Sequence, residues 1–131
     1  AVAENVAAVD WRHLAVLMDS KDEQVYAALF ERAESQVRPL GEPFTATVAE
    51  VLAAAPRPLL ATGEALDYVQ VRAEGVTLAE AALRMPTANS VWRVGRRLAR
   101  EGVFTGYAHL LPIYSRQPEA VRLWEKNSGA K

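Results

Sequence analysis

Cysteine is absent from the 131 residues of the chain, which excludes a disulfide framework and thiolate chemistry. The sequence also lacks an apolar run near the ~20 residues that a membrane-spanning helix needs, and it does not begin with the basic and apolar segments of a secretory signal. Lysine and arginine number 15 against 16 aspartates and glutamates, and the net charge of −1 predicts no global attraction to nucleic acid or acidic lipid. These features predict a cytoplasmic protein without membrane contact.

Sequence motifs for catalysis are missing as well. The histidines, His13 and His109, stand outside any H-x-x-x-H or H-E-x-x-H pattern, so neither a structural nor a catalytic zinc site is indicated. No G-x-x-x-x-G-K-[ST] or G-x-G-x-x-G segment occurs, and no serine lies in a nucleophile elbow. The sequence gives no sign of catalysis, and we expect no catalytic residue, cofactor or metal in this chain.

An apolar share of 50% over this length is typical of one globular domain. The stretch LAVLMDSKDEQVYAALFE joins two apolar runs, Leu14–Met18 and Gln24–Phe30, through a short charged link. We interpret the runs as two antiparallel strands. A helix over the second run is the alternative, because Ala27 and Ala28 weaken a strand there. The link has no Asn-Gly or Asp-Gly, so a tight two-residue turn is not indicated.

Helices are predicted on either side of this hairpin. Ala1–Val9 reads as the end of a helix, and either Thr45 or Thr47 is suited to begin a helix that runs to Ala55. A short buried strand, Leu59–Thr62, follows. Strands interspersed with helices predict a mixed α/β fold.

The clearest helix is PTANSVWRVGRRLAREG, with Pro86 expected in its first turn and Gly102 just past its end. Arginines spaced by three and four residues share one face of this helix: Arg93, Arg96, Arg97 and Arg100. The favoured interpretation is a solvated face with cations near a helix C-terminus. The alternative is an anion patch that contacts phosphate, for instance that of RNA, because arginine forks suit phosphate.

Stretches along the whole chain resemble one family, the bacterial tRNA threonylcarbamoyladenosine biosynthesis protein TsaB, also called YeaZ. LMDSKDEQVYAALFE is similar to the family's D-[AS]-R-x-x-E-V-Y-x-[AG]-x-[YF] hairpin, and LLATGEAL resembles its strand that ends in a glycine-containing turn. MPTANSVWRVGRRLAREG and LLPIYSRQPEA are similar to the family's last helix and its closing L-x-P-x-Y-[LS]-R-x-x-x-A signature. Lys21 and Gln24 depart from the family's arginine and glutamate, which removes a bidentate fork and a charge, and Ser115 replaces a commoner leucine.

This resemblance implies an actin-like ATPase fold of the ribonuclease H-like type, which is built from two lobes. The family's first lobe begins with a D-T-S or D-T-A strand and carries a glycine-rich segment, and neither is present here. We therefore expect residues 1–131 to form a single domain, the C-terminal second lobe, without the N-terminal lobe. Its expected architecture is a mixed sheet with a β-hairpin and flanking helices, and residues 126–131 are expected to be a frayed tail.

For function, the resemblance implies a non-catalytic subunit that supports the placement of threonylcarbamoyl on an adenosine of tRNA. Its partners in the full-length protein would be the TsaD-like catalytic subunit and the TsaE-like ATPase, with a homodimer as a further assembly and with only indirect contact to tRNA. In the family, the first lobe makes most of the TsaD contact and of the self-dimer. One alternative is half of the active site of an actin-like kinase or of a glycoprotease-like peptidase. Another is an RNA-contact module that works through the arginine patch.

The resemblance and the charged link together define a candidate surface that faces a partner or the cleft between lobes: Asp19, Lys21, Gln24, Tyr26, Gly63, Tyr114 and Arg116. A simpler interpretation of the link is a solvated bend, since loops are polar by default. Simpler, structural interpretations also apply to two other residues: Gly63 can form a tight turn, and Tyr114 can pack in the core. Arg116 is predicted to pair with an acidic group such as Asp19.

Overall fold

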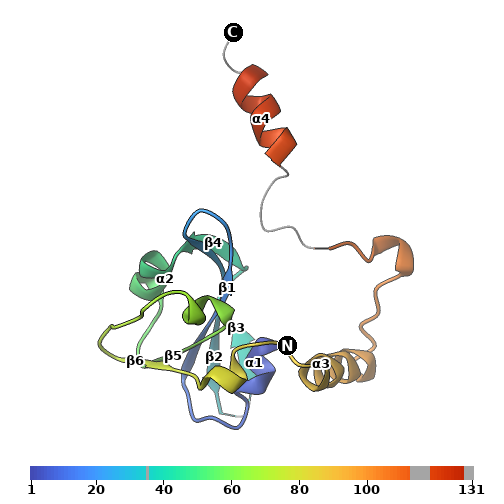
Figure 1. The fold of residues 1–131 in the computed structure, drawn as a ribbon. Helices are drawn as coiled ribbons and strands as arrows, with labels where there is room; N and C mark the ends of the chain where they lie inside the picture. Colours follow the sequence, from blue (N-terminus) through green and yellow to red (C-terminus); the bar gives the residue numbers. More distant parts are fainter. Residues whose placement is uncertain (35, 113–118, 129–131) are drawn as a thin grey trace.

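The computed structural model describes residues 1–34, 36–112 and 119–128 (Figure 1). Its elements, in chain order, are α1 (Val2–Asn5), β1 (His13–Asp19), β2 (Gln24–Ala33), β3 (Gln36–Pro39), β4 (Phe44–Thr47), α2 (Val48–Ala54), β5 (Leu59–Thr62), η1 (Glu64–Asp67), β6 (Val76–Leu78), η2 (Ala81–Leu83), α3 (Ala88–Arg100), η3 (Tyr107–His109) and α4 (Glu119–Ser128). Over these residues, no helix has the length and apolar character that crossing a bilayer demands.

The strands form one mixed sheet in the order β3-β2-β1-β5-β6, and β4 also pairs with β2. β1 is antiparallel to β2 and parallel to β5, which in turn is parallel to β6. β4 pairs with the first half of β2, over Gln24–Ala27, while β3 pairs with the second half, over Phe30–Ala33. The predicted hairpin is therefore confirmed, and a helix over the second apolar run is wrong.

The link between β1 and β2 is tighter than its composition indicates. Asp22 and Glu23 have φ values of 62° and 61°, and the Gln24 N–H donates to the Lys21 carbonyl at 3.4 Å. Two consecutive residues with positive φ are the signature of a type I′ turn. The expectation that no tight turn occurs here is therefore wrong, because two acidic residues adopt a conformation in which glycine and asparagine are usual.

Strand alternation divides the buried side chains between the two faces of the sheet. On one face, α2 and η1 cover a core that includes Leu17, Val25, Val51, Leu59 and Leu66. On the other face, α1 covers a second core that is formed by Val2, Val6, Trp11, Leu14, Val16, Leu60 and Ala79. The sheet is thus buried on both sides around β1 and β5, which explains why these two strands read as continuous apolar runs.

Local caps fix the helix boundaries. Thr47, one of the two predicted alternatives, begins α2 through a capping box with Glu50. Thr87 begins α3, so Pro86 precedes the cap and its expected first-turn position is wrong. Gly102 has a φ of 73° and its N–H donates to the Ala99 carbonyl at 3.2 Å, which confirms the predicted glycine just past the helix end.

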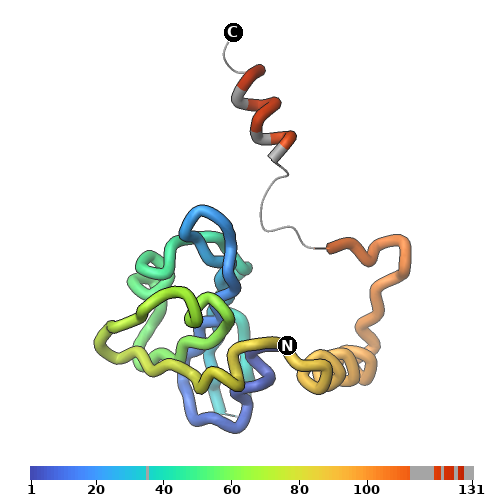
Figure 2. Tube along the Cα trace, in the orientation of Figure 1, coloured from blue at the N-terminus to red at the C-terminus, as the bar shows by residue number. Residues whose placement is uncertain are grey.

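The chain leaves the sheet after α3. Figure 2 shows the trace beyond α3 running away from the body, with α4 standing apart from the sheet. Residues 126–128, expected in a frayed tail, belong to α4, and residues 129–131 lie outside the described residues. We refer to residues 103–112 together with α4 as the C-terminal arm.

Candidate interaction surfaces

The hairpin residues of the predicted partner surface lie close in sequence but are divided between the faces of the sheet. Asp19 pairs with Val25, whose side chain belongs to the core under α2. Tyr26 pairs with Met18, which packs against the core under α1. Lys21 lies in the turn and is exposed, whereas Gln24 and Tyr26 are half-buried. A single partner placed against one face of the sheet would therefore contact only part of this set.

Gly63 ends β5 at a point of close backbone contact. Its φ is 116°, and a Cβ added there would lie 2.0 Å from the carbonyl oxygen of Leu17 in β1. Only glycine allows the chain to leave β5 so near to the neighbouring strand. This contact gives Gly63 a structural role. Tyr114 and Arg116, and with them the predicted pairing of Arg116 with Asp19, lie outside the described residues.

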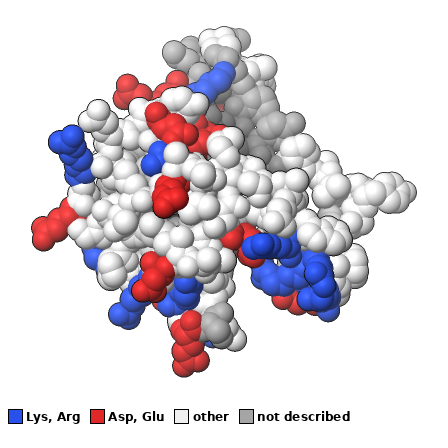
Figure 3. All heavy atoms as spheres, turned by 60° about the horizontal axis from the view of Figure 1, so that its bottom comes forward, with Lys and Arg blue, Asp and Glu red and all other residues white. Residues whose placement is uncertain are grey.

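The four arginines of α3 are brought together as the helical spacing predicts, and we call them the arginine stripe: Arg93, Arg96, Arg97 and Arg100. All four side chains are exposed, and with Glu101 they surround a shallow hollow of about 390 Å³. Figure 3 shows a cluster of basic side chains on the side of the molecule where α3 lies, while other basic side chains are scattered over the visible face. Within the described part of the chain, none of these guanidinium groups has a hydrogen bond or an ion pair.

The C-terminal arm carries large apolar side chains that face solvent. Phe104 is 78% exposed, Leu111 is 77% exposed and Trp124 in α4 is 69% exposed. Further exposed apolar side chains of the arm are Val103, Leu110, Val121 and Leu123. Exposed apolar surface of this extent is typical of sites that another protein surface covers.

A feature that the sequence reasoning missed is the anchoring of the α1–β1 loop by Arg32 of β2. The Arg32 guanidinium lies 4.0 Å from the ring centroid of Trp11. It also donates to the backbone carbonyls of Val9 at 2.9 Å and of Ala7 at 3.0 Å. The Trp11 indole N–H donates in turn to the Val6 carbonyl at 3.0 Å. No sequence motif marks these contacts, because they join residues that only the folded sheet brings together.

Two other arginines of the body are bound to fixed acceptors. Arg57 donates to the carbonyls of Leu52 and Ala55 at 2.8 and 2.9 Å, and so satisfies the end of α2. Arg84 forms an ion pair with Asp67 at 2.6 Å. These contacts contrast with the arginine stripe, whose guanidinium groups point into solvent.

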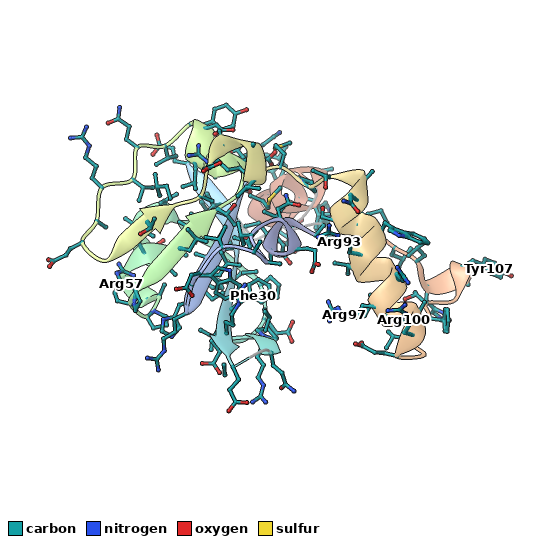
Figure 4. The ribbon with its side chains drawn as sticks, turned by 90° about the horizontal axis from the view of Figure 1, so that it is seen from below. Phe30, Arg57, Arg93, Arg97, Arg100 and Tyr107 are labelled. Atoms are coloured by element: carbon teal, nitrogen blue, oxygen red, sulfur yellow. The ribbon has the colours of Figure 1, made fainter. Side chains whose placement is uncertain are left out.

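A groove of about 630 Å³ lies between α3 and the edge of the sheet, beside α1. Its walls come from α1, from the edge formed by β2 and β3, and from α3, and they include Phe30, Val37, Val94 and Arg97. Figure 4 shows Phe30 and Arg97 on opposite sides of this groove, with Arg93 and Arg100 further along the same helix. The groove therefore places an apolar floor beside one edge of the arginine stripe.

The surroundings of three titratable side chains are defined: His13, His109 and Glu50. Nδ1 of His13 lies 3.1 Å from the Pro58 carbonyl oxygen, while His109 is exposed at the end of η3. Among the described residues, no group of three or more His, Cys, Asp or Glu side chains is placed to hold a metal ion. The backbone N–H of Thr47, and then its hydroxyl, hydrogen-bond to the Glu50 carboxylate and lower its pKa below the ordinary value.

The sheet order and the helices on both faces define an α/β protein, and comparison with known proteins refines that class. No family model and no curated protein sequence matches the chain. The structure is similar to YeaZ from Pseudomonas aeruginosa, with a TM-score of 0.66 and 18% identity over 86% of this chain. It is also similar to the crystal structure of an uncharacterized protein with similarity to peptidase YeaZ from Pseudomonas aeruginosa, with a TM-score of 0.64 and 17% identity over 88% of this chain.

The chain spans 55% of each of these structures. The expected mixed sheet with a β-hairpin and flanking helices is thereby confirmed, in a fold similar to that of YeaZ, while the assignment to the second lobe stays a prediction. At this level of identity the likeness concerns the fold alone.

Proposed function

We propose that the chain is the second lobe of a TsaB-like subunit. In this role the subunit performs no reaction itself and works in the cytoplasm. It supports threonylcarbamoyl transfer to tRNA by binding a TsaD-like catalytic protein, with a TsaE-like ATPase as a further partner. The YeaZ-like fold supports this proposal, as do the hairpin and C-terminal motifs of the sequence.

The exposed apolar surface of the C-terminal arm is the observation that carries an interaction role. A helix or loop that presents Phe104, Leu111 and Trp124 to water leaves a large apolar area uncovered. Burial of such area on another protein gains about 25 cal/mol for each Å² removed from water. Thr47, Arg32 and Arg57, by contrast, serve as a helix cap, a loop anchor and a partner for the end of α2. A surface for protein contact is therefore better supported than a reaction centre.

The proposal is tested by co-purification of the full-length gene product with a TsaD-like protein. We expect a complex that the double substitution Phe104→Glu and Leu111→Glu weakens by at least about tenfold, because two charges are then placed on the apolar surface. Weakening rather than complete loss is expected, since the family's first lobe makes most of that contact.

A control places a single glutamate elsewhere on the surface. Tyr68 is 77% exposed on the body after η1, so Tyr68→Glu should leave the complex unchanged. If the full-length product forms no complex with any TsaD-like protein, the proposed function is wrong. If the arm variant binds as tightly as Tyr68→Glu, the complex does not use the arm.

A further inference from the structure

Charge is distributed unevenly along the chain, although its total is close to zero. Four arginines and one glutamate give residues 85–112 a charge of +3. Since the net charge of the whole chain is −1, the remaining residues together carry −4. The helix brings the positive residues closer together. With a rise of 1.5 Å per residue, the stripe from Arg93 to Arg100 is about 10 Å long. The low net charge therefore conceals a local basic surface.

The helix dipole explains only part of this stripe. Arg97 and Arg100 lie in the last turn of α3, where cations interact favourably with the helix C-terminus. Arg93 and Arg96 lie outside that turn and gain little from it, since the effect falls off within one turn. Each arginine also has like-charged neighbours three or four residues away, and such pairs destabilise a helix. Stability alone therefore does not account for the arrangement.

The stripe is built for a ligand that brings its own negative charge. Within the described part of the chain its guanidinium groups have no carboxylate partner, whereas Arg84 in the body has Asp67 at 2.6 Å. The guanidinium groups of the arginine stripe, together with Glu101, line the hollow of about 390 Å³. Guanidinium groups bind phosphate oxygens with two parallel N–H donors, so a chain of phosphates fits the stripe better than a single carboxylate.

An aromatic side chain flanks the arginines. Trp92 is 64% exposed and lies four residues before Arg96, so the two are neighbours on the helix surface. Tyr107, which is 95% exposed, projects from η3 beyond Arg100 (Figure 4). Exposed aromatic rings beside a basic groove are the means by which proteins bind single strands: the cations hold phosphates and the rings stack on bases.

We infer that the arginine stripe and Trp92 form a binding site for a single-stranded nucleic acid. Arg93, Arg96, Arg97 and Arg100 contact successive phosphates, and the Trp92 ring stacks on a base. The double helix fits the site less well, because its bases are not free to stack on the ring. This inference does not depend on a TsaD-like partner, since the 131-residue chain itself carries the whole site.

The test measures fluorescence anisotropy of labelled oligoadenylates of about twelve nucleotides, one RNA and one DNA, with the 131-residue chain. Four phosphate contacts predict a slope of log K against log salt of about −2.8, which weakens binding about 50-fold between about 50 and about 200 mM salt. The Arg93→Gln and Arg97→Gln double variant should reduce the slope to about −1.4. If one of the two oligonucleotides binds more tightly, that result identifies RNA or DNA as the preferred ligand.

Two further variants separate stacking from charge. Trp92→Leu should weaken binding about tenfold and leave the salt slope unchanged, because it removes a stacking ring and no charge. The control for the arginine double variant is Arg12→Gln with Arg72→Gln, which removes the same charge from exposed positions outside the stripe. It should change neither the affinity nor the salt slope. Circular dichroism checks that each variant keeps the helix content of the parent.

Three results would overturn the inference. One is the absence of binding at about 50 mM salt, where phosphate contacts are strongest. Another is an equal loss of binding in the Arg12 and Arg72 control. The third is an unchanged affinity of Trp92→Leu together with equally tight binding of polyglutamate, which would mark the stripe as a surface for acidic polypeptides. None of these results bears on whether the full-length product binds a TsaD-like protein.

Discussion

Arg32 provides the sharpest test of how the body of the protein is held together. Its guanidinium stacks on Trp11 and donates to the carbonyls of Val9 and Ala7, so one side chain of β2 fixes the loop that feeds β1. Arg32→Met keeps the length of the aliphatic stem and removes the guanidinium. We expect this substitution to loosen the loop and to expose Trp11, which is otherwise 7% exposed.

The magnitude follows from the three contacts. The partly buried bond to Val9 joins a charged donor to a carbonyl and contributes about 1.5 kcal/mol. The exposed bond to Ala7 contributes about 0.5 kcal/mol, and the stacking on Trp11 about 0.5–1 kcal/mol. Arg32→Met should therefore lower the free energy of unfolding by about 2.5–3 kcal/mol, which for a chain of this length lowers Tm by about 9–11 °C.

The assay is urea denaturation followed by far-ultraviolet circular dichroism and by tryptophan fluorescence. Arg32→Lys should lose about half as much stability as Arg32→Met, because lysine keeps the charge but not the fork. The control is Arg38→Met on β3, where the one hydrogen bond of the guanidinium within the described residues goes to the exposed Gln36 side chain at 2.8 Å. Equal stability of Arg32→Met and Arg38→Met would refute the role given to the three contacts.

The remaining predictions concern a glycine and a helix cap. Gly63→Ala should lower the free energy of unfolding, measured by urea denaturation, by more than about 3 kcal/mol, because the added methyl group collides with the Leu17 carbonyl. Gly41 has a similar φ but nothing within 4 Å of an added Cβ, so Gly41→Ala should lower it by only about 1–2 kcal/mol. Equal losses would refute the clash. The pKa of Glu50 is lowered by the hydrogen bonds from Thr47, so its stabilisation is present above the pKa of the unfolded chain and is lost as pH falls through the lower, folded pKa. Glu50→Gln should be less stable than the parent near neutral pH, and the difference should shrink at about pH 3; a difference independent of pH would contradict this.

The central strands of the fold could be predicted because buried strands appear in the sequence as short apolar runs. β1 and β5 are apolar runs bounded by polar or breaker residues, and Leu59–Thr62 forms a strand over the predicted bounds. β3 and β4 were missed, since Gln36–Pro39 and Phe44–Thr47 are largely exposed and are separated by a stretch that ends at Pro43. They are strands because the outer edge of β2 supplies their partners, and pairing of that kind depends on tertiary structure.

The candidate surfaces were predictable to different degrees for a similar reason. The arginine stripe follows directly from helical spacing, so the fold only adds its exposure and the hollow between the side chains. The division of Asp19 and Tyr26 between two faces depends on the register of the hairpin, which the unexpected turn at Asp22 and Glu23 sets. The contacts of Arg32 could not be predicted, because they join chain segments that no local pattern connects.

A reconstituted modification assay tests the proposed role most directly. Unmodified tRNA, a TsaD-like catalytic subunit and a TsaE-like ATPase are incubated with or without the full-length gene product, and threonylcarbamoyladenosine is measured in the digested tRNA. We predict sustained formation of the modified nucleoside only when the product is present, and none when the product replaces the catalytic subunit. Equal modification without the product, or modification by the product alone, would contradict a non-catalytic supporting subunit.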